Sequence, residues 1–185
     1  LTLVEGKTVT PSAKYSMSDF SSWGVTPDLR LKPEITAPGG SIYSAILNGK
    51  YDHLSGTSMA TPQMAGVSAV VLQRVQSDPL FASMTDRQKV DVVQNLIMGT
   101  ARPLADADQS SGALYSPRKQ GAGLVDALAA TTSSVYPTVV GAPEQSRPKA
   151  DLGDGTTGWH FDVTLHNLSG VEATYELSSQ ALSEN

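Results

Sequence analysis

Apolar residues surround the segment from Met59 to Val75 on every side that a helix would present. The long polar side chains within it are Gln63, Gln73 and Arg74. An α-helix that is apolar all round is a buried one, so the pattern predicts a buried helix over residues 57–76. A hydroxyl group from Thr57 or Ser58 is expected to cap its first turn.

A second helix is expected from residue 86 to residue 98. Thr85 and Gln88 have the spacing of a capping box, in which each side chain satisfies a backbone N–H group near the other. Its apolar face is formed by Val90, Val93 and Ile97, with Leu96 beside it. Gly99 ends this helix, and a short third helix is expected over residues 124–130.

Shorter apolar runs, separated by glycine and proline, predict strands in the first part of the chain. The segment 32–40 contains a short apolar run between two prolines and closes with glycines, which suits a short buried strand leading into a loop. The runs 42–47 and 51–54 flank Asn48-Gly49, a strong turn signal, and predict a hairpin. Residues 1–4 form another expected strand.

Towards the C-terminus the pattern becomes a strict alternation. Residues 159–166 alternate apolar and polar positions without interruption, and residues 171–177 repeat the alternation after a turn at 167–170. Two such strands joined by a short turn predict a hairpin with one buried face. Because two strands alone are marginally stable in water, this hairpin needs a larger sheet.

Composition narrows the class of protein. The chain has 185 residues, of which 39% are hydrophobic and 17% charged, as in an ordinary globular protein. No run approaches the roughly 20 apolar residues of a membrane-spanning helix. The net charge is −5 and the basic residues are scattered, which argues against a nucleic-acid partner. The absence of cysteine excludes disulfides, zinc–thiolate sites and cysteine nucleophiles.

The strongest chemical signal is the segment 56–62, with the sequence GTSMATP. It places Ser58 in the first turn of the expected buried helix, where free N–H groups and the helix dipole favour a developing anion. Gly56 leaves room for the backbone of a peptide substrate to approach. These are the requirements of a serine nucleophile with an oxyanion pocket. Spacing alone leaves a second interpretation open, in which Ser58 is only a helix cap.

Three segments together resemble the subtilisin-like serine proteases, or subtilases. Residues 56–62 resemble the segment that carries the family's nucleophile. Residues 31–39, LKPEITAPG, preceded by FSSWG at 20–24, resemble the strand and loop before it. Residues 116–127, SPRKQGAGLVDA, are similar to the end of the catalytic domain in the cell-envelope proteinases, the lactocepin-like branch.

The resemblance implies an α/β fold. Residues 1–132 are expected to be the C-terminal part of a subtilisin-like domain, which has three layers around a parallel sheet. Residues 133–185 are expected to be a linker and the first strands of a fibronectin-type-III-like β-sandwich. The chain starts at Leu1 and shows no export signal, so either such a signal has been removed or the chain is an internal piece of a longer protein. The resemblance favours the internal piece.

The resemblance also implies an activity, which is the hydrolysis of peptide bonds through an acyl-enzyme on Ser58. A histidine would take the Ser58 proton and an aspartate would orient that histidine. The Ser58 N–H group and an asparagine side chain would bind the oxyanion, with the Thr57 hydroxyl contributing. Gly56 leaves space for the substrate, and Met59 would lie on the leaving-group side of the cleft.

Partners and location follow from the same resemblance. The expected partners are a protein or peptide substrate and the missing N-terminal part of the same catalytic domain. The expected location is extracellular or at the cell surface, in the cell wall. No cofactor is indicated, although calcium is possible in the parent enzyme. Cleavage preference, natural substrate, anchoring mode and oligomeric state are not determined by the sequence.

The chain departs from the family in one important respect. No segment before Ser58 resembles the family's aspartate or histidine motif, and His53 is interpreted as a local side chain. His160 and His166 are expected on the solvated face of the C-terminal hairpin. Gln63 stands where the family usually has a histidine, but that histidine is not part of the triad. Because the motifs of the triad aspartate and histidine are missing, we expect the chain alone to be inactive.

Two other functions stay open at this level. A degenerate protease could serve as a cell-surface binding or structural module, or residues 135–185 could be the active part of a β-domain protein. No metal site is predicted, because the pairs Asp106/Asp108 and Asp151/Asp154 lack calcium-loop spacing and are interpreted as solvated turns. The sequon at residues 167–169 is likewise interpreted as a plain turn.

Overall fold

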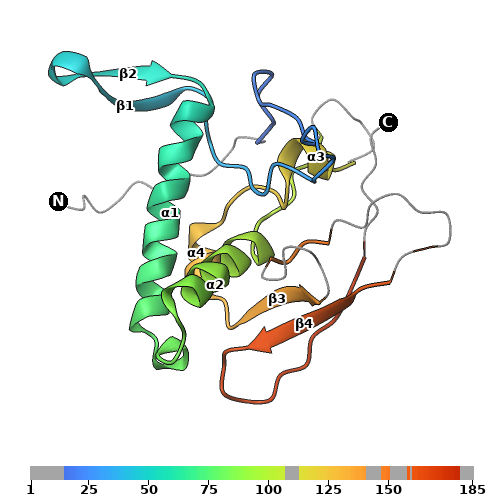
Figure 1. The fold of residues 1–185 in the computed structure, drawn as a ribbon. Helices are drawn as coiled ribbons and strands as arrows, with labels where there is room; N and C mark the ends of the chain where they lie inside the picture. Colours follow the sequence, from blue (N-terminus) through green and yellow to red (C-terminus); the bar gives the residue numbers. More distant parts are fainter. Residues whose placement is uncertain (1–14, 107–112, 141–146, 151–157, 159, 180–185) are drawn as a thin grey trace.

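The structure is a computed structural model that describes residues 15–106, 113–140, 147–150, 158 and 160–179. Its elements, in chain order, are β1 (Ile42–Ile46), η1 (Leu47–Gly49), β2 (Lys50–Leu54), α1 (Thr57–Ser77), η2 (Pro79–Phe81), α2 (Asp86–Gly99), α3 (Pro117–Gln120), α4 (Ala127–Thr132), β3 (Val135–Val140) and β4 (Asp162–Asn167). The β1–β2 hairpin projects from the N-terminal end of α1, and β3 and β4 lie beyond α2 (Figure 1). This mixture of helices and strands is consistent with an α/β fold.

Helix α1 is present as predicted, but it is covered on one side only. Val71 and Val75 are its buried residues, and they join the main core. The buried members of that core are Val71, Val75, Phe81, Val92, Val93, Leu96, Ile97, Ala130 and Tyr136. Val70, in contrast, is 53% exposed. The prediction of a helix buried all round is therefore wrong for this chain, because α2, α4 and η2 pack against one side of α1 and leave the other open.

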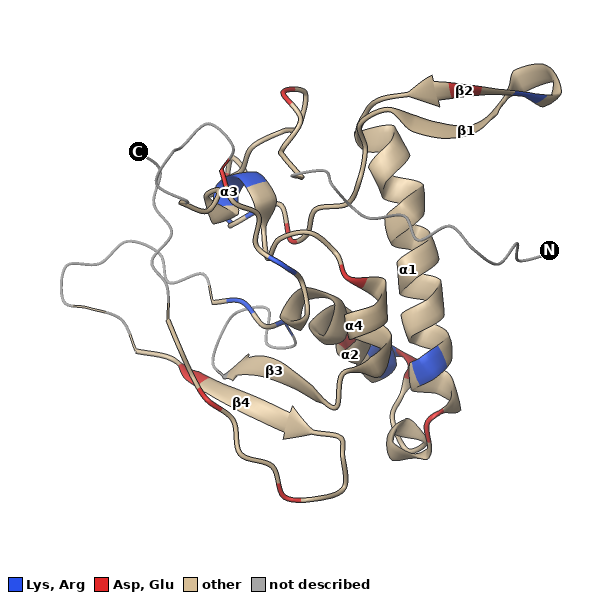
Figure 2. Cartoon of the chain, turned by 180° about the vertical axis from the view of Figure 1, so that it is seen from behind, with Lys and Arg blue, Asp and Glu red and all other residues tan. Residues whose placement is uncertain are grey.

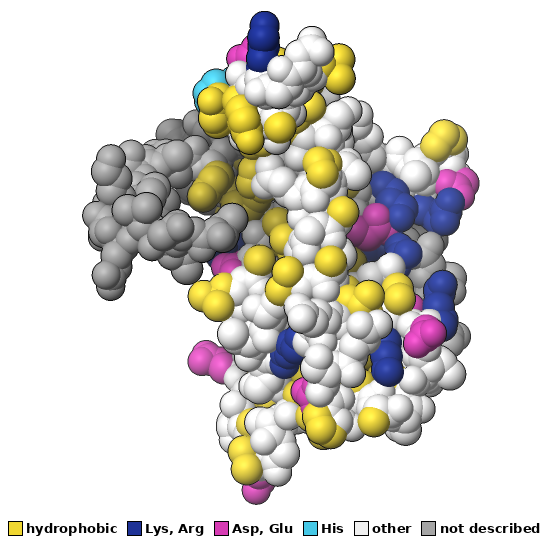
Figure 3. Space-filling view, turned by 90° about the vertical axis from the view of Figure 1, so that its left-hand side faces the viewer, with side chains coloured by type: hydrophobic (Ala, Val, Ile, Leu, Met, Phe, Trp, Pro, Cys, Tyr) yellow, Lys and Arg dark blue, Asp and Glu magenta, His cyan; other side chains and the backbone are white. Residues whose placement is uncertain are grey.

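The open side of α1 carries small and apolar side chains. Ala65, Gly66, Ala69 and Val70 are all exposed. The space-filling view of this side shows scattered hydrophobic side chains among backbone atoms along the helix (Figure 3). No helix among the described residues has both the length and the apolar character needed to cross a bilayer.

The two long helices begin in different ways. Gly56 is the N-cap of α1 and no side chain caps the helix, so Thr57 and Ser58 are its first residues and not its cap. The predicted cap is therefore wrong. Helix α2 has the predicted capping box, in which the Thr85 hydroxyl accepts from the backbone N–H group of Gln88 and the Gln88 side chain accepts from that of Thr85.

The core face of α2 differs slightly from the predicted one. Val92, Val93, Leu96 and Ile97 are buried together with Asn95, whereas Val90 is 40% exposed.

Helix α4 begins at Ala127 because the Asp126 carboxylate caps it by accepting from the Ala129 N–H group at 2.9 Å. Helix α3 was not predicted from the sequence.

The pairing of the strands confirms one predicted hairpin and shows that another is wrong. β1 and β2 pair around Asn48-Gly49 as predicted. β4 pairs with β3, from Val135 opposite Asn167 to Val140 opposite Asp162, and residues 171–177 form no strand. The predicted hairpin of 159–166 with 171–177 is therefore wrong, because β3 supplies the backbone partners of β4. The expected strand at 1–4 lies outside the described residues.

The histidines near β4 have different environments. The ring of His166 stacks on Tyr136 with 4.5 Å between ring centroids, and its Nε2 lies 2.8 Å from the Thr138 hydroxyl. His166 is therefore packed on the sheet and not on a solvated face as predicted. Burial raises the pKa of Tyr136. His160 is solvated, as predicted, and lies 3.5 Å from Asp162 with its side chain 90% exposed.

The segment before β1 connects the start of α1 to the rest of the fold. The predicted strand at 32–40 is reduced to one parallel bridge between Thr36 and Leu124, and no other parallel pairing occurs in the part of the chain that the structure describes. The Thr36 N–H group donates to the Gly123 carbonyl at 2.9 Å, and the Gly56 N–H group donates to the Gly39 carbonyl at 2.8 Å. These two hydrogen bonds attach the segment before β1 to Gly123 and to the residue that precedes α1.

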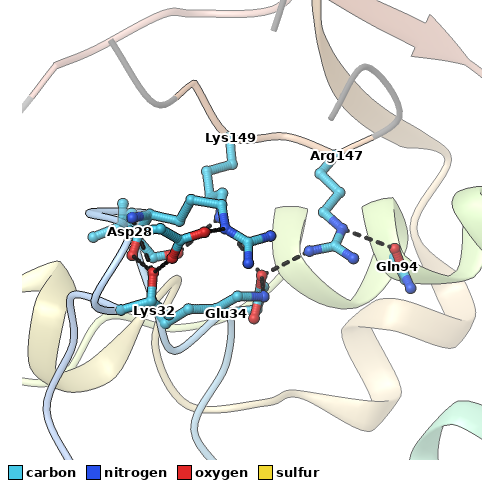
Figure 4. Close-up of polar contacts among 9 residues, drawn as sticks. Asp28, Lys32, Glu34, Gln94, Arg147 and Lys149 are labelled. Atoms are coloured by element: carbon cyan, nitrogen blue, oxygen red, sulfur yellow. Dashed lines mark hydrogen bonds and ion pairs between the residues drawn. The ribbon is translucent and has the colours of Figure 1, made fainter. Parts of the chain in front are cut away.

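A cluster of charged side chains around Glu34 joins three separate segments (Figure 4). Glu34 pairs with Lys32 and accepts from Nη1 of Arg147 at 2.7 Å. Nζ of Lys149 lies 3.5 Å from the same carboxylate oxygen. Nε of Arg147 also donates to the Gln94 side chain on α2 at 3.2 Å. The cluster ties the chain after β3 to the chain before β1 and to α2.

The charges in this cluster set the pKa of Glu34. Partial burial by itself raises that pKa, but Lys32, Lys149 and Arg147 together outweigh burial and hold the pKa below its ordinary value of 4.5. A carboxyl group whose pKa is lower in the folded chain stabilises the fold above its unfolded pKa. That contribution is lost as the pH falls through the folded pKa.

We expect Glu34→Gln to lower the free energy of unfolding near neutral pH by about 1 kcal/mol, because it removes the anion that the surrounding cations share. The difference from the wild type should shrink as the pH falls below about 4.5. Thermal melts over a pH series measure it. Glu172→Gln, at an exposed position, is the matched control, and a Glu34→Gln deficit that stays constant down to acid pH would contradict the assignment.

Candidate active site

Ser58 is exposed at the N-terminal end of α1. It is the second residue of the helix, so its N–H group is among the first four that have no partner within the helix. No described residue hydrogen-bonds its hydroxyl group. Its hydroxyl group is therefore exposed and unpaired among the described residues, and it lies where the helix dipole favours negative charge.

Backbone contacts fix the position of Ser58. Gly56 adopts a φ of 154°, a conformation that side chains disfavour. A Cβ atom on Gly39 would lie 2.9 Å from the Gly56 carbonyl oxygen and 3.3 Å from the Ala60 Cβ atom. Glycine at both positions thus allows the chain before β1 to approach the first turn of α1. The Gln63 side chain adds a hydrogen bond to the Pro38 carbonyl at 2.9 Å.

A groove runs between the β1–β2 hairpin and the first turns of α1, with a volume of about 310 Å³. Its lining residues are Ile42, Ser44, Ala45, Asp52, Leu54, Ser58, Met59, Pro62 and Gln63. Ser58 and Met59 form the wall on the helix side, and Leu54 belongs to the hairpin wall. A flexible peptide could enter this groove and bring a carbonyl group to the Ser58 hydroxyl.

A second cavity of about 320 Å³ lies on the other side of the turn before α1. Gly56 and Thr57 line it, together with Phe20 and Leu104. The four candidate residues are therefore consecutive in the sequence but line two different cavities. Ser58 and Met59 face the groove, whereas Gly56 and Thr57 face the second cavity.

The histidines of the chain lie away from Ser58. The chain has three histidines, and none of them lines the groove or the second cavity. His53 lies on β2, with its ring tilted against that of Tyr43 at 4.9 Å between ring centroids, and its Nδ1 lies 3.1 Å from the Ser41 carbonyl oxygen. It is a local side chain, as the sequence indicated. None of the three histidines therefore contacts the Ser58 hydroxyl group among the described residues.

The acidic side chains form no metal site in the described part of the chain. No group of three or more histidine, aspartate or glutamate side chains is gathered there. Asp108, Asp151 and Asp154 lie outside the described residues. At the sequon, the Asn167 side chain accepts from the Ser169 N–H group at 2.9 Å, which confirms the turn.

Comparison with known proteins places the chain in a family. The sequence model of the subtilase family matches residues 8–123. The chain belongs to the subtilase family. The match spans the segment before β1, the hairpin and α1, and so includes every candidate residue named above.

Two groups of subtilase relatives are similar to most of the chain. The C5a peptidase of Streptococcus pyogenes is 37% identical over 153 residues, which cover 83% of this chain and 12% of that protein. The PII-type proteinase of Lactococcus lactis subsp. cremoris is 38% identical over 182 residues, covering 93% of this chain and 10% of that protein. The chain thus spans about a tenth of the length of these relatives.

A solved structure, that of the prenylagaramide maturation protease PagA, also matches. It is 31% identical to this chain, with a TM-score of 0.45, and the match covers 63% of this chain and 37% of PagA.

The wall opposite Ser58 was not predicted from the sequence. Ile42, Ser44, Asp52 and Leu54 lie on one face of the hairpin, because Ile42 pairs with Leu54 and Ser44 pairs with Asp52. The predicted hairpin would have been enough to identify the residues of this wall. Alternate residues of a strand share a face, so the turn at Asn48-Gly49 would have placed these side chains together.

Proposed function

We propose that this chain provides the nucleophile and part of the substrate cleft of a subtilisin-type serine endopeptidase. The observation that carries the proposal is the position of Ser58. Its hydroxyl group is exposed, has no hydrogen-bond partner among the described residues and lies beside a groove at the start of α1. A structural helix cap would instead direct its hydroxyl group at the helix backbone.

In the proposed reaction, Ser58 Oγ attacks the carbonyl carbon of the scissile peptide bond while a base takes its proton. The resulting oxyanion accepts hydrogen bonds from the Ser58 N–H group and from an asparagine side chain outside this chain, and the helix dipole lowers its energy. The proton passes to the leaving amine as the C–N bond breaks. Water then releases the acyl group from Ser58.

We infer that the base comes from polypeptide other than this chain. All three histidines of the chain lie elsewhere, and His53 is turned towards Tyr43 and Ser41. We infer that the N-terminal part of the same catalytic domain supplies the histidine and its aspartate. The open apolar side of α1 supports this inference, because an exposed apolar face of this kind favours a protein partner.

The remaining assignments belong to the same proposal. Thr57 assists the oxyanion site, Gly56 leaves space for the substrate backbone, and Met59 lies on the leaving-group side. Residues 1–132 belong to the peptidase domain and residues 133–185 begin a fibronectin-III-like domain. The substrate is a protein or peptide, no cofactor takes part in the reaction, and the enzyme acts outside the cell or at its surface.

The direct test compares the full-length protein with this chain alone, using a labelled, unfolded protein as substrate. We expect cleavage by the full-length protein and none by the isolated chain. Binding of the substrate by the full-length protein without cleavage would favour a binding module. Cleavage by the isolated chain would contradict the inference that the base lies elsewhere.

A further inference from the structure

Among the residues that the structure describes, Asp52 is the only charged one that lines the groove beside Ser58. It is also the only acidic residue between Glu34 and Asp78. The view by charge shows one acidic and one basic band on the hairpin and no charge along α1 until its C-terminal end (Figure 2). Within the part of the chain that the structure describes, no other acidic residue shares the groove with Asp52.

The Asp52 carboxylate is exposed and has capacity to bind a cation. Its Oδ1 accepts from the His53 N–H group at 2.8 Å. Its Oδ2 forms no hydrogen bond or ion pair with any described residue. Lys50 lies on the same face of β2 but further towards the hairpin tip, and it does not line the groove.

Ser44 pairs with Asp52 across the hairpin, and the walls between Asp52 and the start of α1 carry apolar side chains together with Gln63. Leu54 and Ile42 form the hairpin wall between Asp52 and the start of α1, and Met59 faces them from the helix. Successive residues of a strand advance about 3.3 Å, so Asp52 lies about 7 Å beyond Leu54 along β2. A groove in which Leu54, Ile42 and Met59 lead to a carboxylate matches a long aliphatic side chain with a positive head.

We propose that Asp52 makes this groove selective for lysine or arginine in the substrate, within the first three residues after the scissile bond. The proposal rests on the proposed function, which assigns the Met59 side of the cleft to the leaving group. The aliphatic stem would pack on Leu54, Ile42 and Met59, and the cationic head would pair with Asp52. An acidic side chain at the same position would be repelled.

The test uses the full-length protein and internally quenched peptides that carry lysine, norleucine or glutamate at each of these three positions. Norleucine has the stem without the charge, so the ratio of kcat/KM for lysine over norleucine isolates the ion pair. At low salt we expect a ratio of about five at one position, with glutamate below norleucine. The ratio should fall as salt is added.

Variants of Asp52 connect the preference to this side chain. In Asp52→Asn the lysine-to-norleucine ratio should fall to about one, and in Asp52→Lys glutamate should be preferred over lysine. Asp86→Asn, at an exposed position on α2, is the matched control and should keep the wild-type ratio. Readily measured cleavage with no preference for lysine at any of the three positions would overturn the proposal. Failure to cleave any peptide would overturn the proposed function as well.

Discussion

Replacing Ser58 by alanine should abolish peptide-bond hydrolysis by the full-length protein. We expect kcat to fall on the order of 10⁴-fold or more, the scale on which serine proteases depend on their triads. The free energy of unfolding should change by less than about 0.5 kcal/mol, because the side chain is exposed and its hydroxyl group has no partner among the described residues. Steady-state kinetics and chemical denaturation measure the two quantities.

Ser77→Ala is the matched control for this experiment. Ser77 is an exposed serine at the other end of α1, and its hydroxyl group donates to the Gln73 carbonyl at 2.8 Å. Its replacement should leave kcat unchanged. If Ser58→Ala retains activity while the protein stays folded, Ser58 is not the nucleophile.

Replacing Gly39 by alanine should damage the site through the backbone. The new Cβ atom would lie 2.9 Å from the Gly56 carbonyl oxygen, so the turn before Ser58 must shift. Displacements of this kind cost about 100-fold in rate when they misplace a reacting group. The crowding should also destabilise the fold by about 2 kcal/mol.

The neighbouring glycine provides the control. Among the described residues, a Cβ atom on Gly40 would meet only the Ser18 hydroxyl oxygen, at 3.4 Å, and Gly40 has no positive φ. Gly40→Ala should therefore retain kcat/KM within about twofold. Equal losses in Gly39→Ala and Gly40→Ala would show that the contact with Gly56 has no special role.

The features predicted correctly from the sequence are those determined by neighbouring residues. The capping box of Thr85 and Gln88 and the turn at Asn48-Gly49 act within a few positions, so they locate the start of α2 and the β1–β2 hairpin. The segment 56–62 likewise marked the start of α1 and the serine that the structure exposes there.

The features that were missed depend on residues far apart in the sequence. Alternation identified β4 as a strand, but it could not show that β3 is its partner. The apolar pattern of α1 indicated a surface that needs covering, whereas the structure shows that this chain covers only the side of Val71 and Val75. The ion pair of Glu34 with Arg147 joins residues 113 positions apart, beyond any local pattern.

The most direct test of the account is the site at which a fluorophosphonate reacts with the full-length protein. Such probes form a covalent bond with an activated serine hydroxyl group. After complete inhibition, digestion and mass spectrometry should find the adduct on Ser58 in a one-to-one ratio. Complete inhibition with the adduct on another serine, and with Ser58 unmodified, would contradict the account.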